Sequence, residues 1–309
     1  MGCIGAWTTT HLIEEGQQVI AFDLNRDTRR IELLLETVDL EKIVVEEGDL
    51  TDYDCVSGLF ERHPIDHVIH LAALQVPFCH ADPVQGARVN VVGTVNLFEA
   101  ARQAGLPHLA YASSVAVYGP VGDDMRRPLL EEVAQTPLTM YGVFKQANEG
   151  TARMYWTDYG LSSIGLRPHT VYGPGRDQGI TSDPTKAMLA AAAGKPFTIQ
   201  YSNGFLLQFA SDVARQFIEA SRHPGRGNHV FNLGGETPSM PGLIEMIREI
   251  VPGARIDFLE HKFPIPELMD SSALQEHFTR VPETPLGSGI ERTIQMFRRF
   301  LAEGRLAAP

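Results

Sequence analysis

The chain opens with the stretch MGCIGAWTTTHLIEEGQQVIAFD (residues 1–23), which decides the fold. Gly2 and Gly5 stand at a spacing that permits a tight turn and lets the backbone approach a pyrophosphate closely. The helical pattern behind them would direct the positive end of its dipole at that pyrophosphate. Residues 18–23 are predicted to form a strand ending at Asp23, about 20 residues on, where a carboxylate would bind an adenosine ribose. The stretch therefore predicts a dinucleotide site.

A turn of this kind is expected to follow a strand, but residue 1 already lies inside the motif. We therefore expect that the first strand of the sheet is missing from the chain, either because the start codon is misassigned or because the chain is a fragment. That strand would be the central one of the sheet, so its loss would leave the cofactor domain incomplete.

Short apolar runs alternate with helical patterns through the first two-thirds of the chain, which predicts an α/β fold with a doubly wound, Rossmann-type parallel sheet. Further strands are predicted at 42–46, 67–73, 108–114 and 228–233, and helices at 86–103, 141–159 and 212–221. We predict a cofactor-binding domain over residues 1–176, to which 204–235 return. Residues 177–203 and 236–309 would form a smaller, mixed substrate-binding lobe.

Composition and charge exclude several classes of protein. The formal net charge of -12 argues against broad nucleic-acid binding, which needs a basic footprint. No run approaches the roughly 18 apolar residues of a membrane span, and no basic start leads into an apolar secretory segment. Cys3, Cys55 and Cys79 are too few and too scattered for a disulfide framework or a zinc site. We expect a cytoplasmic protein with no metal, nucleic-acid or membrane partner.

Ser114, Tyr141 and Lys145 form the candidate catalytic set. Tyr141 and Lys145 are four residues apart in a predicted helix and therefore lie on one face of it. A cation beside a phenol favours the phenolate and lowers the phenol pKa from about 10, which would suit Tyr141 as a general base. Ser114 could hold the substrate oxygen in line. The set is suited to removing a proton from a hydroxyl while a hydride leaves the same carbon.

The ends of the predicted strands supply further candidates for the cofactor site. Asp23 would favour NAD over NADP, although the neighbouring Arg26, Arg29 and Arg30 leave NADP open. The remaining candidates for contact with the cofactor are Gly2, Cys3, Ile4 and Gly5 in the turn, Asp49 and Leu50 beside the adenine, and Leu71, Ala72 and Ala73. Gln75 follows a strand end and could line the substrate pocket.

Together these residues resemble the extended short-chain dehydrogenase/reductase family, in particular its NAD-dependent epimerase/dehydratase branch. The matching motifs are Gly2-x-x-Gly5, Asp23, Gly48-Asp49-Leu50, His70-Leu71-Ala72-Ala73, Asn90-x-x-Gly93-Thr94-x-Asn96, Ser114-x-x-x-Tyr118-Gly119, Tyr141-x-x-x-Lys145 and Leu166-Arg167-Pro168-x-x-x-Tyr172-Gly173-Pro174-Gly175.

The resemblance implies that Tyr141 is the base and that Ser114 contacts the reacting oxygen. It implies that Lys145 lowers the pKa of Tyr141 and binds the nicotinamide ribose. It also places Pro168 and His169 near the nicotinamide ring. Finally, the resemblance implies a homodimer whose interface is a four-helix bundle built from the helices at 86–103 and 141–159.

Two departures from the family pattern narrow the expected chemistry. Members that dehydrate nucleotide sugars carry Thr-Asp-Glu where this chain has Ser114-Val115-Ala116, so a 4,6-dehydratase is not expected. Sugar-nucleotide enzymes of the branch tend to carry an arginine just before the aspartate that corresponds to Asp212, where its guanidinium clamps a phosphate. Residues 205–209 contain no arginine, and Arg176 is the remaining candidate for an anion contact.

We therefore expect an NAD-dependent enzyme that transfers a hydride at a hydroxyl-bearing carbon of a sugar, a sugar acid or a related small polyol. A dehydrogenase would release the carbonyl product, whereas an epimerase would retain the ketone and reduce it from its other face. Both begin at Tyr141, so the catalytic set does not separate them. A nucleotide-sugar 4-epimerase resembling UDP-glucose 4-epimerase is the alternative. A non-catalytic NAD sensor or scaffold is disfavoured because the catalytic set is intact.

Overall fold

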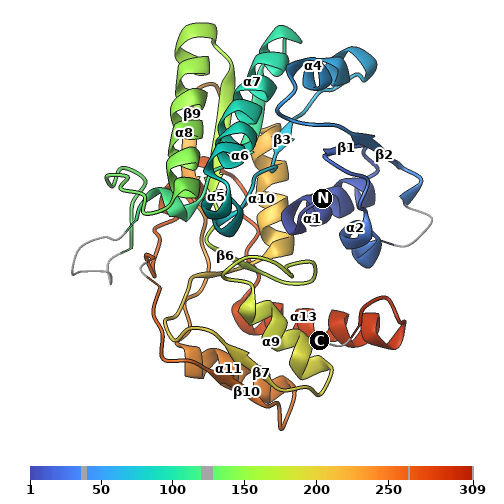
Figure 1. Cartoon of the computed structure of the whole chain (residues 1–309), viewed down its shortest axis with the longest axis vertical. Coiled ribbons are helices and arrows are strands. Elements are labelled where there is room, and N and C mark those ends of the chain that lie inside the picture. Colours follow the sequence, from blue (N-terminus) through green and yellow to red (C-terminus); the bar gives the residue numbers. More distant parts are fainter. Residues whose placement is uncertain (36–39, 120–127, 264, 308–309) are drawn as a thin grey trace.

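The computed structural model describes residues 1–35, 40–119, 128–263 and 265–307. Within these ranges, parallel strands carry helices on both faces, and a smaller group of helices and short strands lies beside them (Figure 1). The predicted α/β class with a parallel sheet is confirmed.

The described strands are β1 (Val19–Asp23), β2 (Ile43–Glu47), β3 (Ile69–His70), β4 (His108–Ala112), β5 (Ser162–Arg167), β6 (Thr170–Tyr172), β7 (Phe197–Ile199), β8 (Leu207–Phe209), β9 (Asn228–Asn232) and β10 (Ile256–Phe258). The described helices are α1 (Cys3–Glu14), α2 (Arg29–Leu34), α4 (Tyr53–Arg62), α5 (Val76–Ala81), α6 (Pro83–Ala87), α7 (Gly93–Gln103), α8 (Met140–Tyr159), α9 (Asp183–Ala192), α10 (Ala210–Arg222), α11 (Met240–Ile250), α12 (Ser272–His277) and α13 (Leu286–Ala302). A π-helical turn, η1 (Arg88–Val92), joins α6 to α7, and a 3-10 turn, η2 (Val115–Val117), follows β4. None of the described helices is both long enough and apolar enough to cross a membrane.

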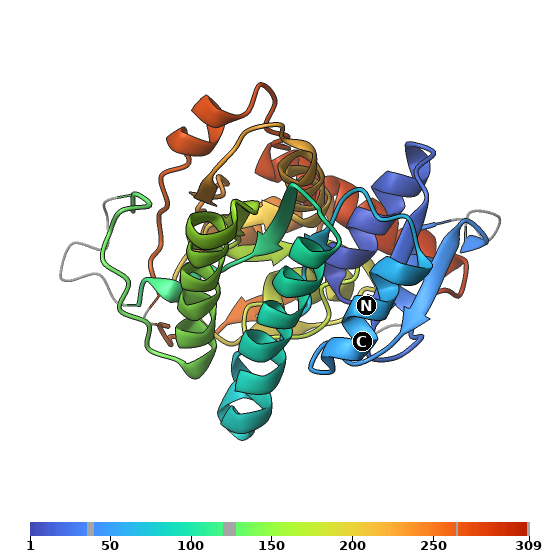
Figure 2. The ribbon, with the colours of Figure 1, turned by 90° about the horizontal axis from the view of Figure 1, so that it is seen from above.

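The four-stranded parallel sheet has the order β3-β4-β5-β9. All of β5 is buried, as expected for a parallel strand that is covered on both faces. Helices α7 and α8 lie side by side on one face, while α1 and α10 pack together on the other (Figures 1 and 2). Because the strands are parallel, their carboxyl ends meet at one edge, where ligands bind in sheets of this kind.

Among the described strands, β1 and β2 pair with each other alone and form a separate parallel ribbon. No strand lies between β1 and β3 in the described part of the chain. The strand predicted at 67–73 is shorter than expected and covers only Ile69–His70. A strand is defined by its ladder of hydrogen bonds, and within the described ranges β3 has such a ladder on the side of β4 alone.

Helix α8 carries two of the three candidate catalytic residues, and its ends are set by sequence. The Thr139 hydroxyl accepts a hydrogen bond of 3.1 Å from the Gly142 N–H and so caps the first turn. Gly160 ends the helix in the left-handed region, at φ 71, which a residue with a Cβ adopts only with strain. These signals place Tyr141 in the first turn of α8, beside the edge of the sheet.

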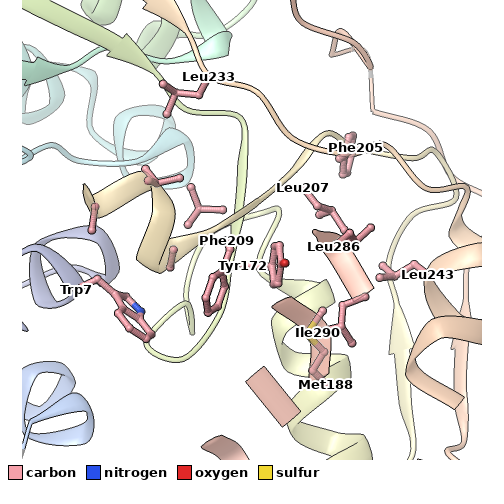
Figure 3. Close-up of a cluster of buried hydrophobic side chains, with 14 of the residues drawn as sticks. Trp7, Tyr172, Met188, Phe205, Leu207, Phe209, Leu233, Leu243, Leu286 and Ile290 are labelled. Atoms are coloured by element: carbon pink, nitrogen blue, oxygen red, sulfur yellow. The ribbon is translucent and has the colours of Figure 1, made fainter. Parts of the chain in front are cut away.

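The largest cluster of buried apolar side chains joins the sheet to the C-terminal part of the chain (Figure 3). The Phe209 ring lies 5.8 Å from the Trp7 ring in edge-on contact and 5.6 Å from the Tyr172 ring. Strands β7 and β10 pair in parallel, which brings the segments around 197–199 and 256–258 together. The two segments that the sequence assigns to one lobe therefore meet in a small sheet of their own.

Candidate functional site

A cavity of about 1740 Å³ runs along the carboxyl ends of the strands and continues between β1 and β3. It is lined by every residue that the sequence singles out for the site: Gly2, Cys3, Ile4, Gly5, Asp23, Asp49, Leu50, Leu71, Ala72, Ala73, Gln75, Ser114, Tyr141, Lys145, Pro168, His169 and Arg176. The fold thus brings them together from distant parts of the chain. What each residue does there stays a prediction.

The N-terminus of α1 opens into this cavity. Gly2 precedes the helix with an extended backbone, and no side chain caps the first turn. A Cβ on Gly2 would meet no described atom within 4 Å, and one on Gly5 would meet only the Leu71 side chain, at 3.9 Å. The backbone is therefore accessible, and the uncapped N–H groups suit the pyrophosphate of a dinucleotide. These residues fit the predicted cofactor.

Asp23 ends β1 at the cavity, and its carboxylate lies 2.9 Å from the amino group of Met1. Arg26, Arg29 and Arg30 are the residues whose charges could bind the 2′-phosphate of NADP. Each of them is paired with an acid. The pairs are Arg26–Glu47 (3.6 Å), Arg29–Asp27 (2.7 Å) and Arg30–Asp177 (2.7 Å). An arginine engaged in this way is less available to a 2′-phosphate, so the geometry favours NAD.

Lys145 and Tyr141 occupy successive turns of α8 on the face toward the cavity. The Lys145 ammonium lies 5.7 Å from the centre of the Tyr141 ring and donates a hydrogen bond of 2.6 Å to the Ala112 carbonyl. Ser114 stands two residues beyond β4, and its hydroxyl accepts a hydrogen bond of 3.2 Å from the Ala116 N–H. The three side chains that the sequence predicts as a catalytic set therefore share one corner of the cavity.

The pKa of Tyr141 differs from the expectation. Burial raises this pKa, while a hydrogen bond with Ser114 and the charge of Arg176 lower it in part. Burial also lowers the pKa of Lys145 to about 8, although Cys79 and Glu149 act to raise it. The expected net lowering of the Tyr141 pKa is thus wrong for this state of the protein, because the loss of water around the phenol outweighs nearby positive charge.

Beyond Lys145, a buried ion pair supports the site. Glu149 lies one further turn along α8, and its carboxylate receives two hydrogen bonds of 2.8 Å from the Arg167 guanidinium. The Ser113 hydroxyl also donates to Glu149, at 2.5 Å, which gives Ser113 a structural role. The sequence analysis does not predict a role for Glu149 or its pairing with Arg167. The position of Glu149, two helical turns after Tyr141, could have indicated such a role.

Gln75 and Arg176 both line the cavity and both approach Gly179. Gly179, at φ 96, makes room for both, because a Cβ there would lie 2.5 Å from the Gln75 amide oxygen and 3.0 Å from the Arg176 guanidinium. The guanidinium donates a hydrogen bond of 3.4 Å to the Thr181 hydroxyl, and its buried Nε has no partner among the described residues. This cation therefore has donors to offer a ligand.

His169 is engaged in contacts of its own. Its Nε2 donates a 2.7 Å hydrogen bond to the Pro266 carbonyl, and burial lowers its pKa to about 4, so the ring is neutral near pH 7. Pro266 belongs to the C-terminal part of the chain and, with Phe263 and Ile265, lines the cavity. His169 thus ties the carboxyl end of β5 to the segment that covers the substrate side.

Gln208 occupies the region where the family resemblance leads one to look for a phosphate-clamping arginine. Its amide oxygen accepts a hydrogen bond of 2.8 Å from the His169 N–H, and its amide nitrogen donates one of 2.9 Å to the Leu233 carbonyl. The side chain is buried and holds backbone groups together. It is therefore not free to bind a phosphate.

Comparison with known proteins gives consistent matches. The family model described as the NAD dependent epimerase/dehydratase family matches residues 1–234. The chain is 30% identical to a UDP-glucose 4-epimerase of Mycolicibacterium smegmatis, with 96% of both chains covered. It is 28% identical to a UDP-glucuronate 4-epimerase of Thermodesulfobacterium geofontis, with 95% of this chain and 92% of that protein covered. A solved structure of Thermus thermophilus UDP-glucose 4-epimerase in complex with NAD is 26% identical, with a TM-score of 0.79 and 96% of both chains covered.

Proposed function

The chain belongs to the NAD dependent epimerase/dehydratase family, and from this premise we propose that it is a 4-epimerase of a nucleotide sugar. The observation that carries the proposal is the meeting of Ser114, Tyr141 and Lys145 at one corner of the cavity. The similarity to UDP-sugar 4-epimerases over nearly the whole chain supports the substrate class.

The residues that would hold NAD lie along the cavity. The first turn of α1 would bind the pyrophosphate, Asp23 the adenosine ribose, and Asp49 and Leu50 the adenine. Lys145 would bind the nicotinamide ribose. When bound, NAD would supply the reversible hydride transfer that an epimerase needs.

The chain's own residues would handle the proton. Tyr141 would remove the proton from the substrate hydroxyl as a general base. Ser114 would hold the substrate oxygen toward Tyr141, and the Lys145 ammonium would stabilise the phenolate by its charge. When the hydride returns to the opposite face of the carbonyl carbon, Tyr141 would give the proton back to the oxygen. Because Val115 and Ala116 are apolar, the site lacks the acid and base that dehydration needs at these positions.

We further propose a homodimer formed through α7 and α8. These helices lie side by side (Figure 2), and their outer surfaces expose apolar side chains, including Val95 (37% exposed) and Val143 (42% exposed). Such a stripe on two neighbouring helices is suited to burial in a four-helix bundle. The three cysteines are free, which accords with a reducing, cytoplasmic location.

The division of labour along the chain is also a proposal. Residues 1–176 and 204–235 would form the cofactor-binding domain, and 177–203 with 236–309 the substrate-binding lobe. The pairing of β7 with β10 and the position of Phe263, Ile265 and Pro266 on the cavity support this division.

A specific observation favours a second candidate, a dehydrogenase of a free sugar or sugar acid. Gln208 is committed to backbone groups, so the usual clamp for a nucleotide diphosphate is not present in that segment. Arg176 could instead bind the carboxylate of a small substrate through its guanidinium.

Incubation with NAD and a panel of substrates separates the candidates. Isomer formation from UDP-glucose or UDP-glucuronate without net NADH supports the epimerase. NADH that accumulates in proportion to a free sugar or sugar acid supports the dehydrogenase instead. NAD binding without either reaction across the panel would favour a non-catalytic protein. Tyr141→Phe serves as the matched inactive variant.

A further inference from the structure

Glu149 stands directly behind the corner occupied by the candidate catalytic residues. Tyr141, Lys145 and Glu149 follow one another at intervals of four residues, so they share one face of α8. Tyr141 and Lys145 line the cavity, but Glu149 does not, and it is only 8% exposed. A carboxylate so far from water needs partners of opposite charge or hydrogen-bond donors.

The partners of Glu149 come from three different parts of the chain. Arg167, at the end of β5, donates one 2.8 Å hydrogen bond to each carboxylate oxygen. Ser113, just after β4, and Gln135 each donate one more, both at 2.5 Å. The Arg167 guanidinium also lies 4.9 Å from the centre of the Tyr118 ring and donates to the Tyr118 hydroxyl. The carboxylate is thus held in one orientation by four hydrogen bonds.

One of these hydrogen bonds reaches the neighbour of Ser114. The Ser113 N–H donates to the Leu166 carbonyl, at 2.8 Å, and its hydroxyl donates to Glu149. Ser113 is therefore fixed through both its backbone and its side chain. Ser114 is the next residue. By holding Ser113, Glu149 therefore also helps to fix the position of the Ser114 hydroxyl.

The charge of Glu149 acts on Lys145. Burial penalises the ammonium form and lowers the pKa of Lys145, while Cys79 on α5 and, to a smaller extent, the Glu149 carboxylate one turn away act to raise it. Charges interact more strongly where water is excluded, so a single buried carboxylate shifts the balance between ammonium and amine. Arg167 holds the carboxylate from its other side.

We propose that Glu149 is a positioning residue for this site: it keeps Lys145 in its ammonium form and orients the Ser113–Ser114 turn, and so prepares both partners of Tyr141. The role rests on the proposed function, in which Lys145 and Ser114 assist Tyr141. A buried ion pair is weak evidence for stability alone, since an apolar pair of similar volume often serves as well. A role in the charge and geometry of the site accounts for a buried Glu149–Arg167 pair at this place.

Titration of Lys145 by NMR tests the proposal without a substrate. The chain has five lysines, so the spectrum of isotope-labelled lysine side chains is simple, and Lys145 is identified by the signal lost in Lys145→Arg. Glu149→Gln keeps the shape of the side chain and removes its charge. We expect the pKa of Lys145 to fall by about one unit in this variant, because an opposite charge nearby typically shifts a pKa by that amount or more.

Two further variants complete the design. Glu46→Gln is the matched control, because Glu46 is also paired with an arginine, at 3.2 Å, but lies on β2 away from α8. It should leave the Lys145 titration unchanged. If Glu149→Gln alone does not fold, the double variant Glu149→Gln/Arg167→Gln avoids an unpaired guanidinium and should show the same direction of shift. A Lys145 titration equal to that of the parent protein in either folded variant would overturn the proposal. Because no turnover is measured, that result is distinguishable from a failure of the proposed function.

Discussion

The Lys145 ammonium donates its 2.6 Å hydrogen bond to the carbonyl of Ala112, the last residue of β4. This bond joins the helix that carries Tyr141 to the strand that leads into Ser114. This hydrogen bond of Lys145 therefore helps to set the distance between the Tyr141 hydroxyl and the Ser114 hydroxyl. Lys145 holds the site together as well as supplying its charge.

Tyr141→Phe should reduce turnover by at least about 100-fold, since it removes the general base, and should leave NAD binding measurable. Turnover and calorimetric NAD binding check this. Tyr53→Phe is the matched control, because the Tyr53 hydroxyl has no hydrogen-bond partner among the described residues and does not line the cavity. Near-normal turnover in Tyr141→Phe would refute the assigned base.

Lys145→Met should lower both turnover and NAD affinity, because it removes the proposed ribose contact and the ammonium beside Tyr141. Calorimetry with NAD gives the affinity separately from the rate. Lys195→Met, in an exposed loop outside the cavity, provides the comparison. An NAD affinity equal to that of the parent protein would remove Lys145 from the ribose site.

The protein should lose stability in mild acid because of buried neutral histidines. Burial lowers the pKa of His70 to about 3. Between that value and an unfolded pKa near 6.5, the unfolded chain binds more protons, so the free energy of unfolding falls as the pH falls through this window. At pH 5 the loss from His70 amounts to about 2 kcal/mol.

Thermal unfolding of His70→Gln between pH 7 and pH 5 checks this effect. The variant should lose less stability over the interval than the parent protein. His80→Gln, at an exposed position, is the control and should follow the parent. An unchanged pH dependence in His70→Gln would contradict the assignment to His70.

Arg167→Met should cost about 3 to 5 kcal/mol of stability, because it leaves the Glu149 carboxylate buried without its partner. Denaturant unfolding measures the loss. Arg102→Met removes the partner of Glu99 in a pair that is about one-third exposed and should cost less. Equal losses in the two variants would argue against a special role of the buried pair.

Val95→Glu should shift the protein from dimer to monomer, since a charge on the apolar face of α7 opposes burial in the proposed bundle. Light scattering after size-exclusion chromatography gives the mass. Val44→Glu places the same charge on an exposed position of β2 and should leave the dimer intact. A monomeric parent protein would exclude the proposed assembly.

Local signals were sufficient for much of the fold and for a set of residues that line the cavity. The alternation of apolar runs located β1, β2, β4 and β9, and the spacing of Tyr141 and Lys145 placed both on one helical face. Such motifs consist of residues that are close in sequence, so the sequence alone reveals them. The site residues followed because parallel strands end at a common edge.

Properties that arise from tertiary contacts were beyond the sequence. The extent of β3 depends on which strands lie beside it, and the upward shift of the Tyr141 pKa depends on how much water the fold removes. The partners of Glu149 come from residues 14 to 36 positions away. A periodic pattern contains no information on such distances.

The separation of β1 and β2 from the other strands has a mechanical consequence. The ribbon is tied to the rest of the molecule through α1, where His11 bonds to Ser211 at 2.9 Å and Glu15 pairs with Arg222 at 2.6 Å. Among the described residues the ribbon and the four-stranded sheet share no hydrogen-bond ladder, so contacts such as these couple the two. A dinucleotide that contacts both Asp23 and Leu71 would link the ribbon to the four-stranded sheet. Binding in the cavity would therefore make the two unfold more cooperatively.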